Sequence, residues 1–120
     1  MTNFSRIKIS NDATTKLKTL KGRTGLTPNL LCRMALCHSL EGQKITQLID
    51  PPEDGQEFNR YTLTGEYDSY FIALIKQRCK LDGLDPEKNF MKYFKAHLNN
   101  GIMTIYSRLN DLADLPNLLK

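Results

Sequence analysis

The stretch that decides the fold reads RIKIS at residues 6–10, NDATTKLKTL at residues 11–20 and KGRTGLTPN at residues 21–29. It predicts a short strand, then a basic helix, then a tight turn that opens a second helix. Later segments carry the 3.6-residue spacing of apolar side chains that is typical of helices. We therefore expect a mainly α fold, in which a short N-terminal strand is followed by about five helices.

The strand over residues 6–10 alternates apolar and polar side chains. This alternation places Ile7 and Ile9 on one face and Arg6, Lys8 and Ser10 on the other. A strand this short is stable only when another strand pairs with its edge. The partner strand can come from the same chain or from a second copy, and self-pairing would make a dimer.

The basic helix that follows has a clear start signal. Ser10 or Asn11 can accept a hydrogen bond from an amide of the first turn and so cap the helix. One stripe of the helix is predicted to face the core. Its members are Ala13, Leu17, Leu20 and Thr24.

The turn over residues 21–29 separates the first two helices. Gly22 or Gly25 can take the left-handed conformation that ends the first helix. Thr27 fits the cap of the second helix, and Pro28 fits its first position, where the missing amide costs nothing. The segment therefore predicts a tight connection between two helices.

The second helix, over residues 28–41, is apolar on every side. Between Arg33 and Glu41 no residue carries a formal charge at neutral pH. A small domain supplies few neighbours to cover such a helix, so part of its surface is predicted to contact another subunit, through Leu31 and Met34. The alternative is a central helix that is wrapped by the later helices of the same chain.

The middle of the chain is predicted to be a loop followed by a strong helix. Residues 42–57 carry Gly, Pro and acidic residues and indicate a loop, while residues 58–63 fit either a strand or an extended arm. The helix covers residues 66–81. Its core-facing side is predicted to be Tyr67, Tyr70, Phe71, Leu74, Ile75 and Leu81.

Two further helices are predicted beyond Gly83. The first begins at Asp85-Pro86 and ends at residues 99–101, which read Asn-Asn-Gly. Its buried residues are expected to be Phe90, Met91, Phe94 and Leu98. The second is defined by Ile102, Ile105, Tyr106, Leu109 and Leu112. Residues 115–120 are expected to be a packed but irregular end.

The length of 120 residues, with 40% apolar content, allows one compact domain over residues 1–120 and no second one. Within it we distinguish a basic strand-helix-helix unit (1–44), an acidic and extended link (45–65) and a helical core (66–120). No apolar run approaches the roughly 20 residues that span a bilayer, and the start lacks the pattern of a secretory signal. A cytoplasmic protein with no membrane contact is expected.

Positive charge is concentrated at one end of the chain. The net charge is +4, but residues 1–44 hold eight Lys or Arg against two acids, Asp12 and Glu41, which is a local balance of +6. Localised charge of this sign favours a polyanion such as a nucleic acid as partner. The alternative is an ordinary solvated helix that happens to use lysine.

The candidate phosphate contacts are the cations of this basic unit. Lysine outnumbers arginine among them, and lysine is a point charge that suits phosphates, whereas arginine favours the bidentate contact with guanine. Helical geometry places Lys18 and Lys21 on one side of the apolar stripe and Lys16 and Arg23 on the other, so no single flat surface engages all four. The full set is Arg6, Lys8, Lys16, Lys18, Lys21, Arg23 and Arg33.

Catalytic and metal-binding patterns are absent from the sequence. His38 and His97 have no evident nucleophile beside them, and no phosphate-binding glycine loop or metal-ligand spacing occurs. All three cysteines, Cys32, Cys37 and Cys79, are expected to be small core residues. Cys79 lies between two cations, Arg78 and Lys80, which could favour a thiolate, and it is the one candidate for reactivity. A protein that is not an enzyme and holds no cofactor or metal is expected.

Residues 6–41 resemble the ribbon-helix-helix class of DNA-binding proteins. In that class a strand with alternating polar residues precedes a helix, a turn of the form Gly-x-Thr/Ser and a second, dimer-forming helix. Here Arg6, Lys8 and Ser10 would form the exposed strand face and residues 25–27 the turn. The resemblance implies a dimeric regulator that inserts its ribbon into the major groove.

The whole chain resembles the DndE family of the bacterial DNA phosphorothioation system. The similarity lies in RIKIS at 6–10, KGRTGLTPN at 21–29, LTGE at 63–66 and NNG at 99–101. It implies membership of a complex that replaces a non-bridging phosphate oxygen of DNA with sulfur, in which this small component does not catalyse. The other components of the complex are then expected partners, together with double-stranded DNA, which we expect in nicked or distorted form because sulfur insertion must disturb the backbone. The strand and the apolar second helix add the expectation of a dimer or tetramer. An adaptor that docks a larger enzyme through its aromatic helices is a third hypothesis.

Overall fold

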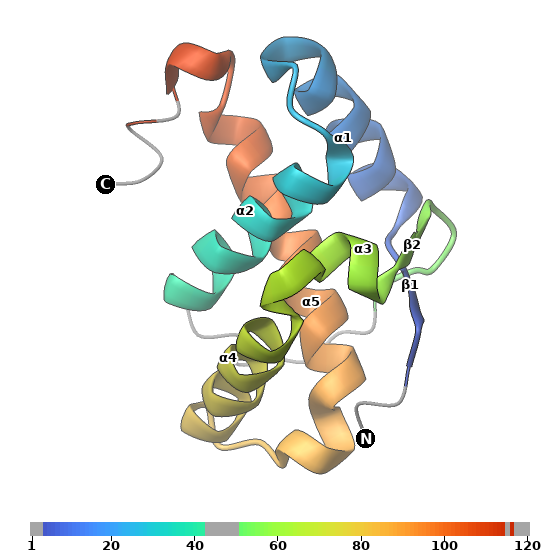
Figure 1. Ribbon diagram of the computed structural model, residues 1–120, viewed down its shortest axis with the longest axis vertical. Coiled ribbons are helices and arrows are strands. Elements are labelled where there is room, and N and C mark those ends of the chain that lie inside the picture. Colours follow the sequence, from blue (N-terminus) through green and yellow to red (C-terminus); the bar gives the residue numbers. More distant parts are fainter. Residues whose placement is uncertain (1–3, 43–50, 115, 117–120) are drawn as a thin grey trace.

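The computed structural model describes residues 4–42, 51–114 and 116, and folds them into a two-stranded sheet and five α-helices (Figure 1). The strands are β1 (Arg6–Lys8) and β2 (Glu57–Asn59). The helices are α1 (Asn11–Thr24), α2 (Pro28–Glu41), α3 (Arg60–Thr64), α4 (Asp68–Leu81) and α5 (Pro86–Arg108). Short 3₁₀ turns cover Gly65–Tyr67 and Leu112–Asp114. The prediction of a mainly helical chain with one short N-terminal strand is confirmed.

The partner of β1 is a strand of the same chain. β1 and β2 run antiparallel, with Ile7 opposite Phe58 and both side chains buried. The alternation of the strand is confirmed for Ile7 and Ile9, which lie inside, and for Arg6 and Lys8, which are exposed. The prediction that Ser10 lies on the exposed face of the strand is wrong. Its side chain is buried and caps α1.

The helix signals of the N-terminal unit are confirmed. The Ser10 hydroxyl accepts a hydrogen bond from the Ala13 amide at 3.0 Å, and the predicted stripe of α1 is buried. The helix ends at Gly25, whose φ of 76° is left-handed, whereas Gly22 lies within the helix. Thr27 caps α2, and Pro28 is its first residue. Local signals were sufficient here because each cap involves residues close in sequence.

α2 lies at the centre of the molecule and crosses α5 (Figure 1). Its apolar side chains meet α5 on one side and α1, α3 and α4 on others, so the alternative of a helix wrapped by its own chain accounts for most of its surface. Leu31 is fully buried in this packing and does not lie on a surface that another copy could contact. Met34 is half-buried at the edge of the core.

The predicted break at residues 99–101 is wrong, because α5 continues through it as one helix of 23 residues. Asn99 uses its side chain inside the protein, accepting from the Ser10 amide at 3.1 Å and donating to the Lys95 carbonyl at 2.7 Å. Gly101 faces the backbone of Ala35, where a Cβ atom would collide. The glycine therefore permits close approach of α2 and α5 and does not end a helix.

The predicted face of the helix at residues 66–81 is partly wrong. Phe71, Ile75 and the small Cys79 form the buried stripe of α4, four residues apart. Tyr67, Tyr70 and Leu81, which were predicted to point inward, are 53%, 59% and 69% exposed. The region predicted as a strand or an extended arm contains β2 and then the short helix α3.

A buried ion pair joins α3 to α4. Arg60 donates from Nε and Nη2 to the two carboxylate oxygens of Asp68, at 3.0 and 2.8 Å, and Thr64 also donates to this carboxylate. The hydrogen bond from Arg60 lowers the pKa of Asp68, followed in effect by the bond from Thr64 and the nearby positive charge, against the opposing effect of burial. The pair fixes the corner where the chain turns from β2 into α4.

The described part of the acidic link contacts the N-terminal unit and α5. Asp54 accepts a hydrogen bond from the Asn11 amide at 2.8 Å, which places a carboxylate at the positive end of α1. Glu57 pairs with Arg6 at 3.0 Å, and Glu53 pairs with Lys95 at 3.3 Å. These three acids are exposed, but each of their carboxylates is engaged by another part of the fold. Residues 43–50 and most of the predicted irregular end lie outside the described residues.

Candidate nucleic-acid interface

α1 carries two exposed lysines on one of its sides. Lys18 and Lys21 are three residues apart, and neither makes an ion pair with any residue that the structure describes. Like charges at this spacing on a helix repel each other by a few tenths of a kcal/mol. An anion bound between them would remove this repulsion.

The other two cations of α1 are already engaged. Lys16 forms an ion pair with Asp12 at 2.7 Å and lies 5.3 Å from the centre of the Tyr106 ring. Arg23 donates to the Tyr106 carbonyl at 3.3 Å and stands 4.7 Å from the same ring. Both therefore face α5, and the division of the four cations between two sides of α1 agrees with the helical geometry predicted from the sequence.

The strand adds one more exposed lysine. Lys8 is exposed and stands directly across the sheet from Glu57. Arg6 is also exposed, but its guanidinium is held by the carboxylate of Glu57. We use the name lysine face for Lys18 and Lys21, which lie on one side of α1 and are exposed and unpaired among the described residues. Lys8 is exposed and unpaired in the same sense, but it lies on β1 and no contact places it beside them.

Arg33 lies elsewhere and has a structural role. Its Nε donates to the Leu63 carbonyl at 2.7 Å and its Nη2 to the Thr62 carbonyl at 3.1 Å, so it satisfies the C-terminal end of α3. A side chain at Gly65 would occupy the space of this guanidinium. No contact brings Arg33 together with the cations of α1.

The turn between α1 and α2 leaves bare backbone beside the lysine face. Gly22 and Gly25 are both exposed, and a Cβ at either position would meet no atom within 4 Å among the described residues. Gly25 needs its positive φ, whereas Gly22 is helical and has no such requirement. The backbone next to Lys21 is therefore open to a ligand.

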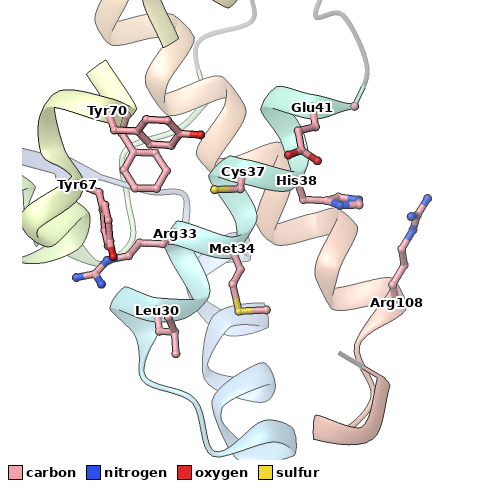
Figure 2. A pocket seen from close by; sticks show the side chains of 11 residues that line it. Leu30, Arg33, Met34, Cys37, His38, Glu41, Tyr67, Tyr70 and Arg108 are labelled. Carbon is pink, nitrogen blue, oxygen red and sulfur yellow. The ribbon is translucent and has the colours of Figure 1, made fainter. Parts of the chain in front are cut away.

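A hollow of about 670 Å³ lies between α2, α4 and the end of α5 (Figure 2). Tyr67 and Tyr70 stand at one side of it, and Arg108 stands at the other. Between them α2 contributes the floor. We call it the tyrosine hollow; its lining is Leu30, Arg33, Met34, Cys37, His38, Glu41, Gly42, Tyr67, Tyr70, Phe71 and Arg108. Sequence reasoning missed this feature because it assigned both tyrosines to the core.

The cysteines are not activated. Cys32 and Cys79 are buried, as predicted for core residues, whereas Cys37 is only half-buried because it lines the tyrosine hollow. Burial raises the pKa of Cys32 to about 12, and burial together with Asp82 and Asp85 raises the pKa of Cys79. The suggestion that neighbouring cations favour a thiolate at Cys79 is therefore wrong, because its acidic neighbours and the desolvation both oppose it.

A Ser-His pair does occur, but inside the core. The Ser39 hydroxyl lies 2.7 Å from Nδ1 of His97, and Asn100 donates to the same hydroxyl at 3.0 Å. Both residues are buried, and burial is the main cause that lowers the pKa of His97 to about 4. The pair links α2 to α5 and is closed to a substrate. Among the described residues no group of three His, Cys, Asp or Glu could hold a metal ion.

None of the helices in the described parts of the chain is both long enough and apolar enough to cross a bilayer.

Comparison with known proteins gives one consistent result. The sequence model of the DndE family, DNA sulphur modification protein DndE, matches residues 6–112. The chain is similar to the crystal structure of DndE from Escherichia coli B7A, described as involved in DNA phosphorothioation modification, with 28% identity and a TM-score of 0.71 over 85% of this chain and 96% of that one. It is also similar to a DndE mutant with two glycine-to-lysine changes, with 26% identity and a TM-score of 0.69 over 85% and 97% of the two chains. No curated protein sequence matches.

Proposed function

Because the chain belongs to the DndE family of DNA sulphur modification proteins, we propose that it is a non-catalytic, DNA-binding component of the machinery that exchanges a non-bridging phosphate oxygen of DNA for sulfur. The solved relatives are described as involved in DNA phosphorothioation, which supports the same role here. The observation that carries the DNA-binding part is the lysine face, where Lys18 and Lys21 stand exposed and unpaired by any described residue.

The lysine face would contact the backbone phosphates of DNA and make no sequence-specific contacts with the bases. An ammonium group is a compact point charge, and neutralising backbone phosphates supplies affinity without sequence information. Lys16 and Arg23 would contribute less, because each must first give up its contact with Asp12 or Tyr106. Weak sequence preference follows.

The protein would not be an enzyme, because its cysteine thiols and the Ser39 hydroxyl are poor nucleophiles in their surroundings. The thiols of Cys32 and Cys79 have raised pKa values, so neither is a thiolate at neutral pH. The hydroxyl of Ser39 is buried with His97. The sulfur chemistry would then belong to the other components of the complex, acting in the cytoplasm where the DNA lies.

Self-association would increase the affinity of the protein for DNA. A dimer or tetramer presents the lysine face two or four times, and linked weak sites bind with far higher avidity than one. Nicked or distorted duplex, which gives access to a backbone under exchange, is the form of DNA that such an assembly would hold.

The ribbon-helix-helix regulator is not favoured by the strand pairing. A regulator of that class reads the major groove with a ribbon that two copies build together. Here the two-stranded ribbon is built within one copy, because one edge of β1 pairs with β2 of the same chain.

The test is charge reversal on the lysine face. We expect the double variant Lys18→Glu/Lys21→Glu to lose at least about tenfold in affinity for duplex DNA, because each lost phosphate contact also becomes a repulsion. The matched control is Lys88→Glu/Lys92→Glu, which reverses two exposed lysines of α5 that lie outside the lysine face. Unchanged DNA binding by the first variant, with assembly into the modification complex intact, would instead support the adaptor hypothesis.

A further inference from the structure

The tyrosine hollow has an unusual lining for the surface of a small protein. Tyr67 and Tyr70 leave more than half of their surfaces exposed, and they come from one side of α4 and the turn before it. Tyr70 is held edge-on against Phe71, with ring centres 5.9 Å apart. Large aromatic side chains that are exposed next to a cavity are typical of sites that stack a flat ligand.

The two cations of the hollow lie on different sides of it, Arg33 beside Tyr67 and Arg108 across from the tyrosines (Figure 2). Arg33 is fixed by the Leu63 and Thr62 carbonyls, which engage Nε and Nη2 and leave Nη1 without an acceptor among the described residues. Arg108 is exposed at the opposite side, without an ion pair to any described residue (Figure 2). Glu41 is the one carboxylate in the lining, which also holds His38, Cys37 and the two tyrosines, so two permanent positive charges face one negative charge. This balance favours an anionic ligand.

Taking rings and cations together, we propose that the tyrosine hollow binds one unpaired nucleotide of a DNA strand, with its base stacked on Tyr67 or Tyr70 and its phosphate near Arg108. The inference rests on the proposed function, since it assumes that the protein binds DNA. A volume of about 670 Å³ lies within the range of roughly 300 to 1,000 Å³ that is common for small-ligand sites. A base has a π-face that any tyrosine can stack, so such a site accepts a nucleotide whatever its identity.

A peptide helix of another protein fits the lining less well. A groove for such a helix is apolar along its length, with the aliphatic anchors of the helix three and four residues apart. Here the floor offers Leu30 and Met34, but the sides present tyrosine hydroxyls and two guanidinium groups, which need polar partners. A nucleotide supplies those partners through its phosphate and base edges.

The experiment compares three DNA duplexes of one sequence by fluorescence anisotropy: fully paired, with one unpaired thymidine at the centre, and with an abasic residue at that place. The wild-type protein is expected to bind the unpaired thymidine about fivefold or more tightly than the abasic duplex, since base-aromatic stacking is the difference between them. Tyr67→Ala/Tyr70→Ala is expected to abolish this preference and to leave affinity for the paired duplex unchanged.

Two variants serve as controls. Tyr67→Phe/Tyr70→Phe keeps both rings and should keep the preference. Tyr61→Ala removes a tyrosine of similar exposure, 54%, that does not line the hollow, and should also keep the preference.

Arg108→Gln tests the phosphate contact. It removes the charge alone and should reduce binding of the thymidine duplex without affecting the paired one.

Three outcomes would overturn the inference: equal affinity for thymidine and abasic duplexes, a preference that survives Tyr67→Ala/Tyr70→Ala, or an effect of that variant only on self-association or on binding of a protein partner. These results leave the proposed function intact when the paired duplex still binds and responds to charge reversal of Lys18 and Lys21. A protein that binds none of the three duplexes defeats both proposals.

Discussion

The lysine face and the tyrosine hollow differ in how much of the fold they depend on. The lysines of α1 project into solvent from a single helix, and removing their charge disturbs no contact with a described residue. The hollow takes its lining from α2, α4 and α5, and its Arg33 is held in place by the end of α3. Substitutions on the lysine face should therefore leave the free energy of unfolding unchanged. The shape of the tyrosine hollow, in contrast, depends on the packing of the helices that line it.

Among the changes that test this difference, Arg60→Ala is expected to have the largest effect on the free energy of unfolding. The change leaves the carboxylate of Asp68 in a mostly buried place, where its side chain is 20% exposed, and loosens the corner from which α4 and Tyr67 start. Breaking a buried pair costs about 3 kcal/mol or more in free energy of unfolding, which chemical denaturation would measure. Any selectivity for an unpaired nucleotide should fall with it.

The matched change in the basic unit is Arg6→Ala. It breaks the pair with Glu57, in which the two side chains are 67% and 40% exposed. An exposed pair contributes less than about 1 kcal/mol, so stability should barely change. A loss for Arg6→Ala as large as that for Arg60→Ala would remove the distinction between the two regions.

The second prediction concerns pH, because His97 joins α2, the floor of the hollow, to α5. Its pKa of about 4 in the folded protein lies below the usual 6.5, so between these values the unfolded chain binds more protons. The free energy of unfolding is therefore expected to fall as pH drops from about 6.5 to 4, by up to roughly 3 kcal/mol. Below that range, protonation of Asp68 should lower it further, because the pKa of this carboxyl is itself lowered in the folded state.

The control for the pH prediction is His97→Gln, in which the decline between pH 6.5 and 4 should largely disappear. Urea denaturation at a series of pH values measures both proteins. A wild-type curve that is flat across this range would show that His97 is not held neutral by its burial.

The third prediction compares two glycines, one under the hollow and one beside the lysine face. Gly101→Ala places a methyl group against the backbone of Ala35 and should cost about 1 to 3 kcal/mol, because α2 and α5 must separate. Gly22→Ala adds the same group to an exposed helical position with open space around it and should stabilise α1 by about 0.5 to 1 kcal/mol. Thermal melts of the two variants would shift in opposite directions, and a shift of the same sign in both would contradict the structure.

Two glycines, Gly25 and Gly101, illustrate what sequence could and could not predict. The caps of α1 and α2 depend on neighbours such as Ser10, Gly25 and Thr27, so local rules were sufficient. Residues 99–101 carry the local signature of a helix end, but their partners are Ser10 and Ala35, far away in the chain. Only the folded structure tells a glycine that ends a helix from one that lets two helices touch.

The candidate sites divide in the same way. The cations of α1 were identified from charge alone, and the pair of Lys16 with Asp12 follows from their spacing of four residues. The contacts of Arg23 with Tyr106 and of Arg33 with the end of α3 are non-local and could not be predicted. The hollow was missed because the spacing of apolar residues in α4 fits two different stripes equally well. One stripe includes the tyrosines, and the other is the buried one of Phe71, Ile75 and Cys79.

The most direct test of the central claim is the salt dependence of binding to duplex DNA. If about four phosphates are neutralised, the logarithm of the binding constant should fall against the logarithm of salt concentration with a slope of about −3.6. In Lys18→Gln/Lys21→Gln the slope should become shallower by about 1.8, since two contacts are lost, while Lys88→Gln/Lys92→Gln should keep the wild-type slope. A slope that is unchanged by the first pair of substitutions would show that the lysine face does not hold the DNA.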